Sequence, residues 1–374
     1  MLIPHTDSED LKNEGLNMLK RIGYLSLLLA ASNVMAETAP ATHHAINYEG
    51  RITKDYAAGT VQFNWPGTTI KTRFIGTQLS MNLIGNGDHF DVLIDGEFSH
   101  TLITLRGNTE QTFTLLDSDQ MRDVTLEVVK RTENYETMAQ LISFDHDGTL
   151  NGTWENQPHI LFIGDSISAG FGSESTKREC TWEEVYTSSN ARLAFPYQTG
   201  ETLDASITQV SFSGLGLIRN WSGNQPHHNL TDYADKAGAI FGRTLAFEDT
   251  YPNLIVVEVG TNDFSTDPQP HEPWSDIEDV KEAWTDRMVE FVTDLKSRYN
   301  NTSVILMPRP AYPYDDIIPA TQEAIERLNN QGQDGVYSHT FVSPLEGCIW
   351  HPTVKEHASI AAKLSDFIAA NNLL

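Results

Sequence analysis

The residues best suited to chemistry in this chain begin with a serine placed at the end of a predicted strand. An apolar run at 160–163 stops at Gly164 and leads directly to Ser166. Open α/β sheets bind their ligands at the carboxyl ends of the strands, so a hydroxyl at this position is well placed to react. We therefore predict that Ser166 is a nucleophile. The alternative is an ordinary turn with a surface serine, which is what an isolated Gly-Asp-Ser usually is.

Three later residues favour the catalytic interpretation. Gly214 follows a second predicted strand, Asn262 follows a third, and His351 precedes Pro352 at the start of the last predicted helix. This order of Ser, Gly, Asn and His resembles the SGNH hydrolases, also called the GDSL family, whose motif blocks carry the same residues in the same order. The resemblance implies an ester hydrolase with Ser166 as its nucleophile.

The chemistry of ester hydrolysis gives each of these residues a role. His351 would take the proton from the Ser166 hydroxyl and later pass it to the leaving alcohol. The backbone N–H groups of Ser166 and Gly214 and the side-chain amide of Asn262 would form the oxyanion hole for the tetrahedral intermediate. Base catalysis requires a neutral imidazole, so activity should fall as the pH drops through the pKa of His351.

One departure from the SGNH pattern concerns the group that orients His351. Members of the family usually carry an Asp three residues before the histidine, where this chain has Cys348, followed by Ile349. The orienting Asp of a catalytic triad contributes roughly 10⁴ in turnover, so a substitute is expected. The simplest is a backbone carbonyl that accepts from the imidazole, which leaves a Ser-His dyad. The carboxylate of Glu346 is the alternative.

The two cysteines of the chain, Cys180 and Cys348, lie near the predicted catalytic residues in the sequence. An even pair in a secreted protein favours a disulfide, which would join the loop after Ser166 to the loop before His351. Two free thiols are the alternative.

Aromatic residues in predicted loops are candidates for sugar binding. Trp221, Tyr312 and Tyr314 fall in predicted loops, and Trp350 lies beside His351. A ring in such a place can stack on a pyranose, although each is equally suited to anchoring its own loop.

Other polar residues receive weaker interpretations. Asp263 is expected to cap the following loop, and Arg219 either binds sugar hydroxyls or pairs with the acidic surface. The stretch 145–148 has part of a calcium-loop pattern, but Leu150 and Asn156 replace the Gly and Glu that such a loop requires. We therefore predict no metal site.

The N-terminus has the pattern of a secretory signal. A basic pair precedes an apolar run at 22–31, and small residues lead up to Ala36. We predict an N-terminal extension over 1–36, with a signal peptide at 18–36 and a secreted or periplasmic product. The apolar run is too short for a stable membrane span. A buried N-terminal helix is the alternative.

The composition excludes some partners. The chain has 25 Lys plus Arg against 51 Asp plus Glu, a formal net charge of −26, which argues against nucleic acid or an anionic membrane. A neutral glycan is not repelled by such a surface. With 374 residues there is room for two cores. The oligomeric state is left open.

The apolar pattern divides the remainder of the chain into two domains. Over 37–150 apolar residues alternate with polar ones in short runs between regular turns, which predicts a β-sandwich. The stretch 149–157 is read as a linker. Over 157–374 strands alternate with helices, which predicts a parallel sheet covered by helices on both faces. Its five predicted strands cover 160–163, 207–212, 254–259, 303–307 and 336–342. A capping box from Ser275 to Glu278 is expected to start one helix.

Both halves carry motifs that resemble carbohydrate esterase family 2. They are the stretches 48–51, 63–68, 73–77, 211–217 and 347–352. The resemblance implies a jelly-roll domain followed by a three-layer α/β/α SGNH domain. It also implies removal of O-acetyl groups from plant polysaccharides such as xylan and glucomannan, through an acetyl-enzyme intermediate and without metal or organic cofactor.

Two other functions are compatible with the motifs. The first is an SGNH lipase or arylesterase, which would require an apolar groove for its acyl group. The second is a non-catalytic glycan-binding protein that uses the β-sandwich. Turnover of a small acetyl ester would exclude the binding protein, and the match in the N-terminal half argues against the lipase.

Overall fold

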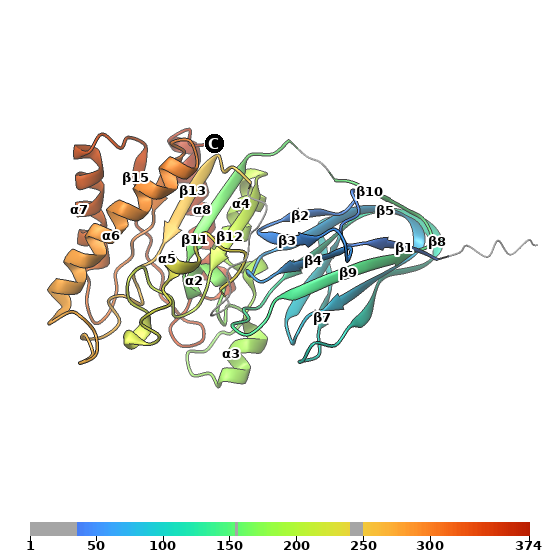
Figure 1. The fold of residues 1–374 in the computed structure, drawn as a ribbon, viewed down its shortest axis with the longest axis horizontal. Coiled ribbons are helices and arrows are strands. Elements are labelled where there is room, and N and C mark those ends of the chain that lie inside the picture. Colours follow the sequence, from blue (N-terminus) through green and yellow to red (C-terminus); the bar gives the residue numbers. More distant parts are fainter. Residues whose placement is uncertain (1–35, 154–155, 240–249) are drawn as a thin grey trace, which may run out of the picture. The chain divides into compact units, whose positions relative to one another are not determined.

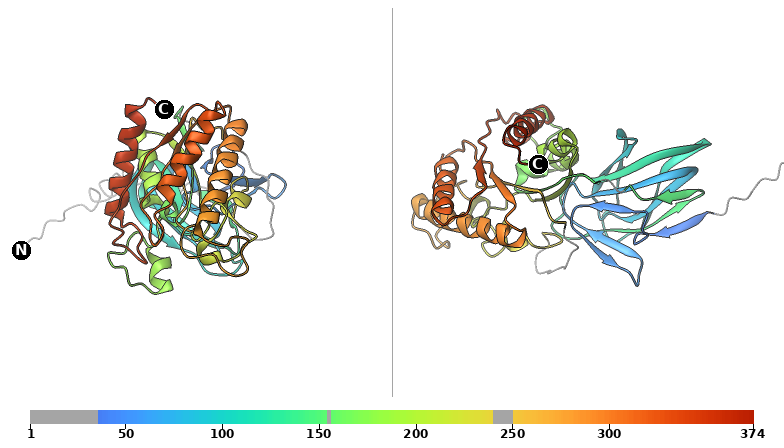
Figure 2. Two further views of the ribbon diagram at one scale, coloured as in Figure 1. Left: turned by 90° about the vertical axis from the view of Figure 1, so that its left-hand side faces the viewer. Right: turned by 90° about the horizontal axis from the view of Figure 1, so that it is seen from above.

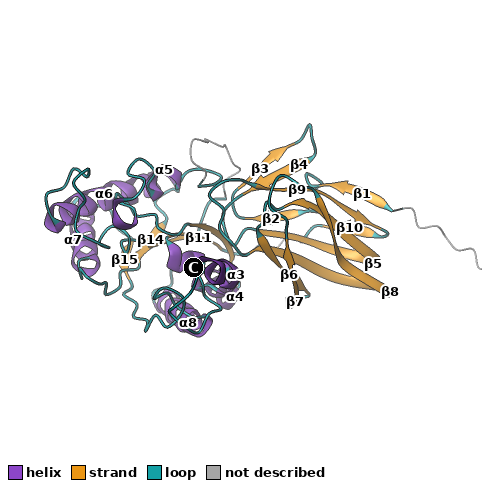
Figure 3. Ribbon diagram, turned by 90° about the horizontal axis from the view of Figure 1, so that it is seen from below, coloured by secondary structure: helices purple, strands orange, loops and turns teal. Residues whose placement is uncertain are grey.

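The computed structural model describes residues 36–153, 156–239 and 250–374. Except for Ala36, the predicted signal peptide and extension lie outside these described residues. Strands make up the regular structure of the described N-terminal part, and the described helices all belong to the C-terminal part (Figure 3).

The N-terminal domain is an antiparallel sheet of ten strands that curls around one apolar core (Figure 1). The strands are β1 (Glu37–Pro40), β2 (Asn47–Glu49), β3 (Ile52–Asp55), β4 (Thr60–Phe63), β5 (Thr69–Ile84), β6 (His89–Ile94), β7 (Glu97–Ile103), β8 (Gln111–Lys130), β9 (Ala139–His146) and β10 (Thr149–Asn151). The two longest, β5 and β8, pair antiparallel with register shifts near Gly76 and Leu79, where a bulge lets a long strand bend. The predicted all-β domain is confirmed.

The start of the predicted linker is wrong. Residues 149–151 form β10, in which Leu150 pairs with Phe74 of β5 and is buried. The apolar side chain at Leu150 extends the core of the N-terminal domain by one short strand, so the chain leaves that domain only after Asn151.

The C-terminal domain contains a parallel sheet of five strands in the order β12-β11-β13-β14-β15. Its strands are β11 (His159–Gly164), β12 (Ser206–Ser211), β13 (Leu254–Glu258), β14 (Ser303–Leu306) and β15 (Val336–Ser338). The predicted parallel sheet is confirmed. However, β15 ends at Ser338, earlier than the predicted 336–342. Pro308 and Pro310 follow β14 and lack the N–H groups that a longer ladder would use.

Helices cover both faces of this sheet, which completes the predicted three layers (Figure 2). One face packs against α4 (Phe195–Leu203) and α8 (Val354–Ala370), and the other against α6 (Ile277–Arg298) and α7 (Ile317–Asn330). The shorter helical elements are α2 (Ser166–Ala169), α3 (Trp182–Ser188), α5 (Leu230–Tyr233), η1 (Ala191–Leu193) and η2 (Trp221–Gly223). Among the described helices, none is both long and apolar enough to cross a membrane.

Helix α6 begins one residue later than its predicted capping box. The N-cap is Asp276, whose carboxylate accepts from the Asp279 N–H at 3.1 Å. The Asp279 carboxylate in turn accepts from the Ser275 N–H at 2.9 Å. A carboxylate caps as well as a hydroxyl does and also favours the positive end of the helix dipole, so Asp276 takes the N-cap position that was predicted for Ser275.

The two domains share apolar packing. Trp65 of the N-terminal domain is fully buried in the core cluster of the C-terminal domain, where its ring lies 6.1 Å from that of Phe212. Its indole N–H donates to the Lys236 carbonyl at 3.1 Å. Leu93 and Val129 join the cluster on the opposite face of the parallel sheet. Residues 36–374 form one compact unit, so both domains can contribute to one site.

Candidate active site

Ser166 lies at a sharp turn from β11 into α2. Asp165 is the N-cap of α2, and its carboxylate accepts from the Ile167 N–H at 3.0 Å. A Cβ on Gly164 would lie 2.1 Å from the Ser168 hydroxyl oxygen, so only glycine fits there. The turn therefore presents Ser166 at the carboxyl end of β11, which is the edge predicted from the sequence.

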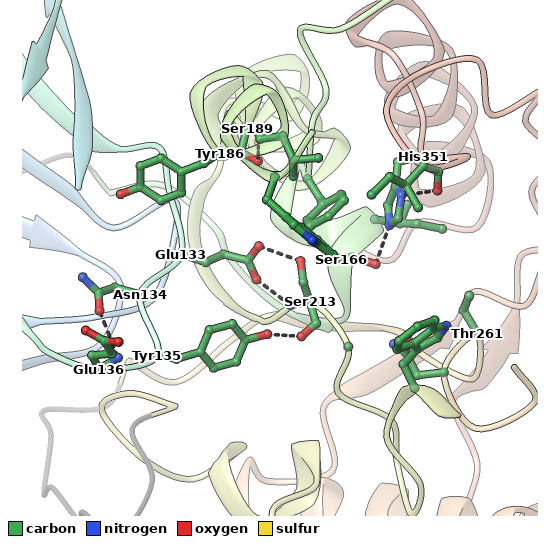
Figure 4. Close-up of a pocket in the computed structure, with 18 of the residues that line it drawn as sticks. Glu133, Asn134, Tyr135, Glu136, Ser166, Tyr186, Ser189, Ser213, Thr261 and His351 are labelled. Carbon is green, nitrogen blue, oxygen red and sulfur yellow. Dashed lines mark hydrogen bonds between the residues drawn. The ribbon is translucent and has the colours of Figure 1, made fainter. Parts of the chain in front are cut away.

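The hydroxyl of Ser166 contacts His351, which lies 185 residues later in the chain (Figure 4). The Nε2–Oγ distance is 2.8 Å. On the other side of the ring, Nδ1 lies 2.9 Å from the Ile349 carbonyl and 3.1 Å from the Cys348 carbonyl. A carbonyl oxygen can only accept, so Nδ1 carries the proton and Nε2 is free to accept from Ser166.

In the part of the chain that the structure describes, Glu346 makes no hydrogen bond to His351. Its side chain is exposed, and its backbone N–H donates to the Glu356 carboxylate at 3.2 Å. The geometry thus matches the predicted backbone carbonyl and not the alternative carboxylate.

The loop before His351 has an unusual backbone. Ile349 and Trp350 have φ of +50° and +54°, in the left-handed region that a β-branched residue such as isoleucine rarely adopts. Two contacts hold the loop: a disulfide joins Cys348 to Cys180, with a Cα–Cα distance of 5.5 Å, and the Ile349 N–H donates to the Arg178 carbonyl at 2.8 Å. The predicted cysteine pairing is present in the structure, and it ties this loop to the segment before α3.

The imidazole of His351 is half-buried and largely surrounded by protein. Its ring lies 4.5 Å from the Phe171 ring, and desolvation lowers the pKa of His351 to about 4, with a smaller contribution from the charge of Arg309. The accepting carbonyls of Ile349 and Cys348 oppose this shift without cancelling it. His351 is therefore neutral at ordinary pH.

Gly214 and Asn262 lie in the wall of the same cavity as Ser166 and His351. Gly214 has φ of +79°, which favours glycine. The Asn262 amide donates to the Leu215 carbonyl at 2.9 Å and, over a longer 3.3 Å, to the Asp165 carboxylate. Asn262 thus connects the loop that carries Gly214 to the turn that carries Ser166.

A pair of carboxyl groups lies beneath this turn. Asp165 and Glu258 are both buried, and Glu258 accepts from the Ser168 hydroxyl at 2.9 Å. Burial raises the pKa of Asp165 to about 6, and repulsion from Asp263 adds to this shift. Burial also raises the pKa of Glu258 well above its usual value, and repulsion from Asp165 adds to that shift. Near neutral pH the pair therefore keeps a proton, which reduces the repulsion behind Ser166.

The cavity has a volume of about 1670 Å³ and is lined by both domains. Three of the four predicted sugar-binding aromatics line it: Trp221, Tyr312 and Trp350, which are 57%, 93% and 61% exposed and so have rings free to stack on a ligand. Tyr314 does not line it. Its ring packs against the core, and its hydroxyl donates to the Asp267 carboxylate.

The sequence interpretation missed several residues that line the cavity, including Tyr135, Phe171, Trp182 and Arg309. Trp182 had a usable signal, since it is two residues from Cys180 and the predicted disulfide would bring it near His351. Tyr135 had no such signal, because it belongs to the N-terminal domain and nothing in the sequence places it near the carboxyl ends of the parallel strands.

The structure assigns different roles to Asp263 and Arg219 from those expected. Asp263 accepts from the backbone N–H groups of residues 217–219, so it fixes the loop after Gly214 and does not cap its own loop. Arg219 is buried and pairs with Glu272 at 2.7 Å, and it also donates to the Asp263 and Thr266 carbonyls. It supports this loop from inside and does not reach the acidic surface.

In the described ranges no group of three or more His, Cys, Asp or Glu side chains could hold a metal ion. Asp147, from the rejected calcium-loop pattern, accepts instead from the Thr77 and Gln78 N–H groups at 2.8 and 2.9 Å. It therefore stabilises the register shift in β5.

Both parts of the chain match known protein families. Residues 162–356 match the GDSL-like lipase/acylhydrolase family, and residues 48–151 match the carbohydrate esterase 2 N-terminal family. The chain belongs to the GDSL-like lipase/acylhydrolase family and is a carboxylic-ester hydrolase.

Full-length relatives narrow the class further. An acetylxylan esterase / glucomannan deacetylase of Cellvibrio japonicus is 27% identical over 355 residues, which cover 91% of this chain and 94% of the relative. The second is a solved carbohydrate esterase whose active site is reported to have divergent catalytic and non-catalytic binding functions. It is 25% identical to this chain with a TM-score of 0.77, and the match covers 87% of this chain and 97% of the esterase. A family two carbohydrate esterase from Clostridium thermocellum, solved with cellohexaose, has the same fold at 23% identity and a TM-score of 0.75, covering 88% of this chain and 100% of its own. These homologues support carbohydrate esterase activity for this chain.

Proposed function

We propose that this protein is a secreted esterase that removes O-acetyl groups from plant polysaccharides such as xylan and glucomannan. The observation that carries the proposal is the 2.8 Å contact between Ser166 Oγ and His351 Nε2 in a cavity walled by both domains. The name of the Cellvibrio relative supports the choice of substrate. Secretion rests on the predicted signal peptide at 18–36.

In the first step Ser166 becomes acetylated. His351 Nε2 takes the hydroxyl proton while Oγ attacks the acetyl carbonyl carbon, which forms a tetrahedral intermediate. His351 then donates this proton to the sugar oxygen. The bond between the acetyl carbon and the sugar oxygen breaks, and the deacetylated sugar leaves. The acetyl group remains on Ser166 as an ester.

In the second step water removes the acetyl group. The freed Nε2 accepts a proton from a water molecule, whose oxygen attacks the acetyl carbonyl. The second tetrahedral intermediate collapses, His351 returns the proton to Ser166 Oγ, and acetate leaves. Through both steps the carbonyls of Ile349 and Cys348 keep the proton on Nδ1 and so preserve the reactive tautomer.

The charge on the carbonyl oxygen is stabilised by donors already in place. The backbone N–H groups of Ser166 and Gly214 supply two, and the Asn262 amide supplies a third by giving up its long 3.3 Å contact with Asp165. The stronger bond from Asn262 to the Leu215 carbonyl keeps the amide in position meanwhile.

The lining of the cavity favours a glycan over a lipid. The wall from the N-terminal domain carries carboxamide side chains, which suit sugar hydroxyls and not an acyl chain: Gln62, Asn108 and Gln140. The exposed rings of Trp221, Tyr312 and Trp350 lie in the same cavity. The Clostridium relative was solved with an oligosaccharide, cellohexaose, which further supports a carbohydrate ligand.

The test is acetate release from acetylated xylan and from acetylated glucomannan, by the wild type and by Ser166→Ala side by side. We expect release by the wild type and at least a 10³-fold smaller rate for Ser166→Ala, at an order-of-magnitude level. Cleavage of longer-chain esters without acetate release from either glycan would favour the lipase alternative. Glycan binding without turnover of any ester would favour the binding protein.

A further inference from the structure

Residues of the N-terminal domain hydrogen-bond to Ser213, the residue before Gly214. We call residues 133–137, which connect β8 to β9, the strap. The Glu133 carboxylate accepts from both the backbone N–H and the hydroxyl of Ser213, the latter at 2.6 Å, and the Tyr135 hydroxyl donates to the Ser213 carbonyl (Figure 4). Every polar group of Ser213 is therefore bonded to the strap.

The strap itself is braced within the N-terminal domain. The Asn134 side-chain oxygen accepts from the Glu136 and Thr137 N–H groups, both at 3.0 Å. The buried side chain of Asn64 donates to the carbonyls of Asn134 and Thr137 at 2.8 and 3.0 Å. Since these bonds fix the backbone on both sides of Tyr135, its hydroxyl is held at a defined position.

A second contact aligns the ring of Tyr135. The ring centroid lies 4.1 Å from that of Phe212, the residue before Ser213, with an interplanar angle of 67°. Phe212 is fully buried beside Trp65. The segment 212–213 is thus held by packing on one side and by hydrogen bonds to the strap on the other.

These contacts determine where the N–H of Gly214 points. The carbonyl of Ser213 and the N–H of Gly214 belong to one planar peptide unit, in which the two groups point in opposite directions when the bond is trans. A donor on the carbonyl side therefore fixes the N–H on the other side. Gly214 has φ of +79° and no side chain, so the residue itself offers little resistance to rotation of this plane.

We propose that Glu133 and Tyr135 are positioning residues for the esterase reaction: they lock the Ser213–Gly214 peptide plane so that the Gly214 N–H serves the oxyanion hole. The N-terminal domain is then a part of the catalytic apparatus and not only an attached glycan-facing wall. This inference rests on the proposed function, because it assigns the Gly214 N–H the role of an oxyanion donor.

The ionisation of Glu133 provides a signature of this role. Desolvation raises the pKa of Glu133 to about 7, repulsion from Asp165 adds to the shift, and Lys130 and the two bonds from Ser213 oppose it. Lys130 itself pairs with Asp88 at 3.2 Å. The carboxylate accepts two charge-assisted bonds from Ser213, and these become weaker neutral bonds when the acid is protonated. The hydrogen bonds between Glu133 and Ser213 therefore weaken as the pH falls through about 7.

The experiment compares Tyr135→Phe and Glu133→Gln with the wild type. Tyr135→Phe keeps the ring against Phe212 and removes only the bond to the Ser213 carbonyl. Matched controls in the same domain are Tyr56→Phe and Asp119→Asn, whose side chains are exposed. For each protein, kcat and KM are measured on 4-nitrophenyl acetate and acetylated xylan from pH 5.5 to 9, together with the thermal midpoint.

We expect kcat to fall about tenfold in each strap variant while KM stays within twofold. The loss is smaller than the roughly 10²–10³ for removing an oxyanion donor, because the Gly214 N–H is misdirected and not deleted. The wild-type kcat should decline on the acid side of pH 7, and this decline should be absent from Glu133→Gln. Both controls should match the wild type.

Two results would overturn the inference. One is a kcat within twofold of the wild type for both strap variants. The other is a loss of kcat that follows a lowered thermal midpoint and leaves the pH dependence in Glu133→Gln unchanged, which would make the strap merely structural. Ser166→Ala is run in the same assay. If the wild type does not release acetate in a Ser166-dependent way, the proposed function fails and not only the inference.

Discussion

The Nδ1 atom of His351 lies 2.9 Å from the carbonyl oxygen of Ile349, whose backbone adopts φ of +50°. A carbonyl dipole thus takes the orienting role for which the resemblance to SGNH hydrolases leads one to expect a carboxylate. The Nδ1 proton is held without a buried negative charge, so His351 gains no charge partner that would raise its pKa.

Removal of the carboxylate at Glu346 should leave catalysis intact. Glu346→Gln is expected to keep kcat within twofold of the wild type, because backbone carbonyls already orient the imidazole. Steady-state kinetics on 4-nitrophenyl acetate provide the measurement. A tenfold or larger loss in a variant that is well folded would revive the carboxylate alternative.

The lowered pKa of His351 predicts that the enzyme stays active at mildly acidic pH. His351 must be neutral to accept the proton of Ser166, and its pKa is about 4. In the Glu133→Gln background, which removes the expected change near pH 7, kcat should stay flat down to about pH 5 and then fall about tenfold per pH unit below 4. Circular dichroism at each pH separates this loss from unfolding. A midpoint near 6.5 would contradict the desolvated environment of the ring.

Truncation of Asn262 should abolish most of the turnover. Asn262→Ala removes a side-chain donor from the cavity that Ser166 lines, and the loss of one oxyanion donor typically lowers kcat by roughly 10²–10³. The variant also loses the bond to the Leu215 carbonyl, so the thermal midpoint is measured alongside. Near-wild-type kcat in a folded protein would remove Asn262 from the oxyanion hole.

The disulfide should stabilise both the fold and the loop that orients His351. It links residues 168 positions apart, and replacing both Cys180 and Cys348 by Ser is expected to lower the free energy of unfolding by about 2–5 kcal/mol. Because Cys348 also supplies a carbonyl to Nδ1, kcat should fall as well. Reductant should reproduce both effects in the wild type and have none on the double variant. An unchanged thermal midpoint under verified reduction would exclude the stabilising role.

The exposed aromatics should matter for polysaccharide and not for small esters. Trp350→Ala is expected to raise KM for acetylated xylan about fivefold to tenfold, since one stacking contact on an exposed ring contributes about 1 kcal/mol. The KM for 4-nitrophenyl acetate should change less than twofold. Tyr314→Phe is the matched comparison, because Tyr314 lies outside the lining of the cavity. Equal KM values for xylan in Trp350→Ala and the wild type would argue that this ring only anchors its loop.

Much of the fold could be predicted because its causes are local. The apolar period of two in the first domain and the alternation of strands with helices in the second are properties of neighbouring residues. The predicted positions of Ser166, Gly214 and Asn262 follow for the same reason, since parallel strands bring their carboxyl ends to one edge. The errors at β15 and at the start of α6 arose where a proline or a second capping carboxylate changed a boundary by a few residues.

The class of each domain, the residues that meet at the sheet edge and the lack of an Asp three residues before His351 all follow from the order of the amino acids. The carbonyls that replace that Asp could be identified only in the folded chain, because every residue has a carbonyl and its direction depends on backbone angles such as φ of +50° at Ile349. The contact between the strap and Ser213 also could not be predicted from neighbouring residues. Glu133 and Ser213 lie 80 residues apart in different domains, and their contact exists only because the packing of Trp65 and Phe212 joins the two cores.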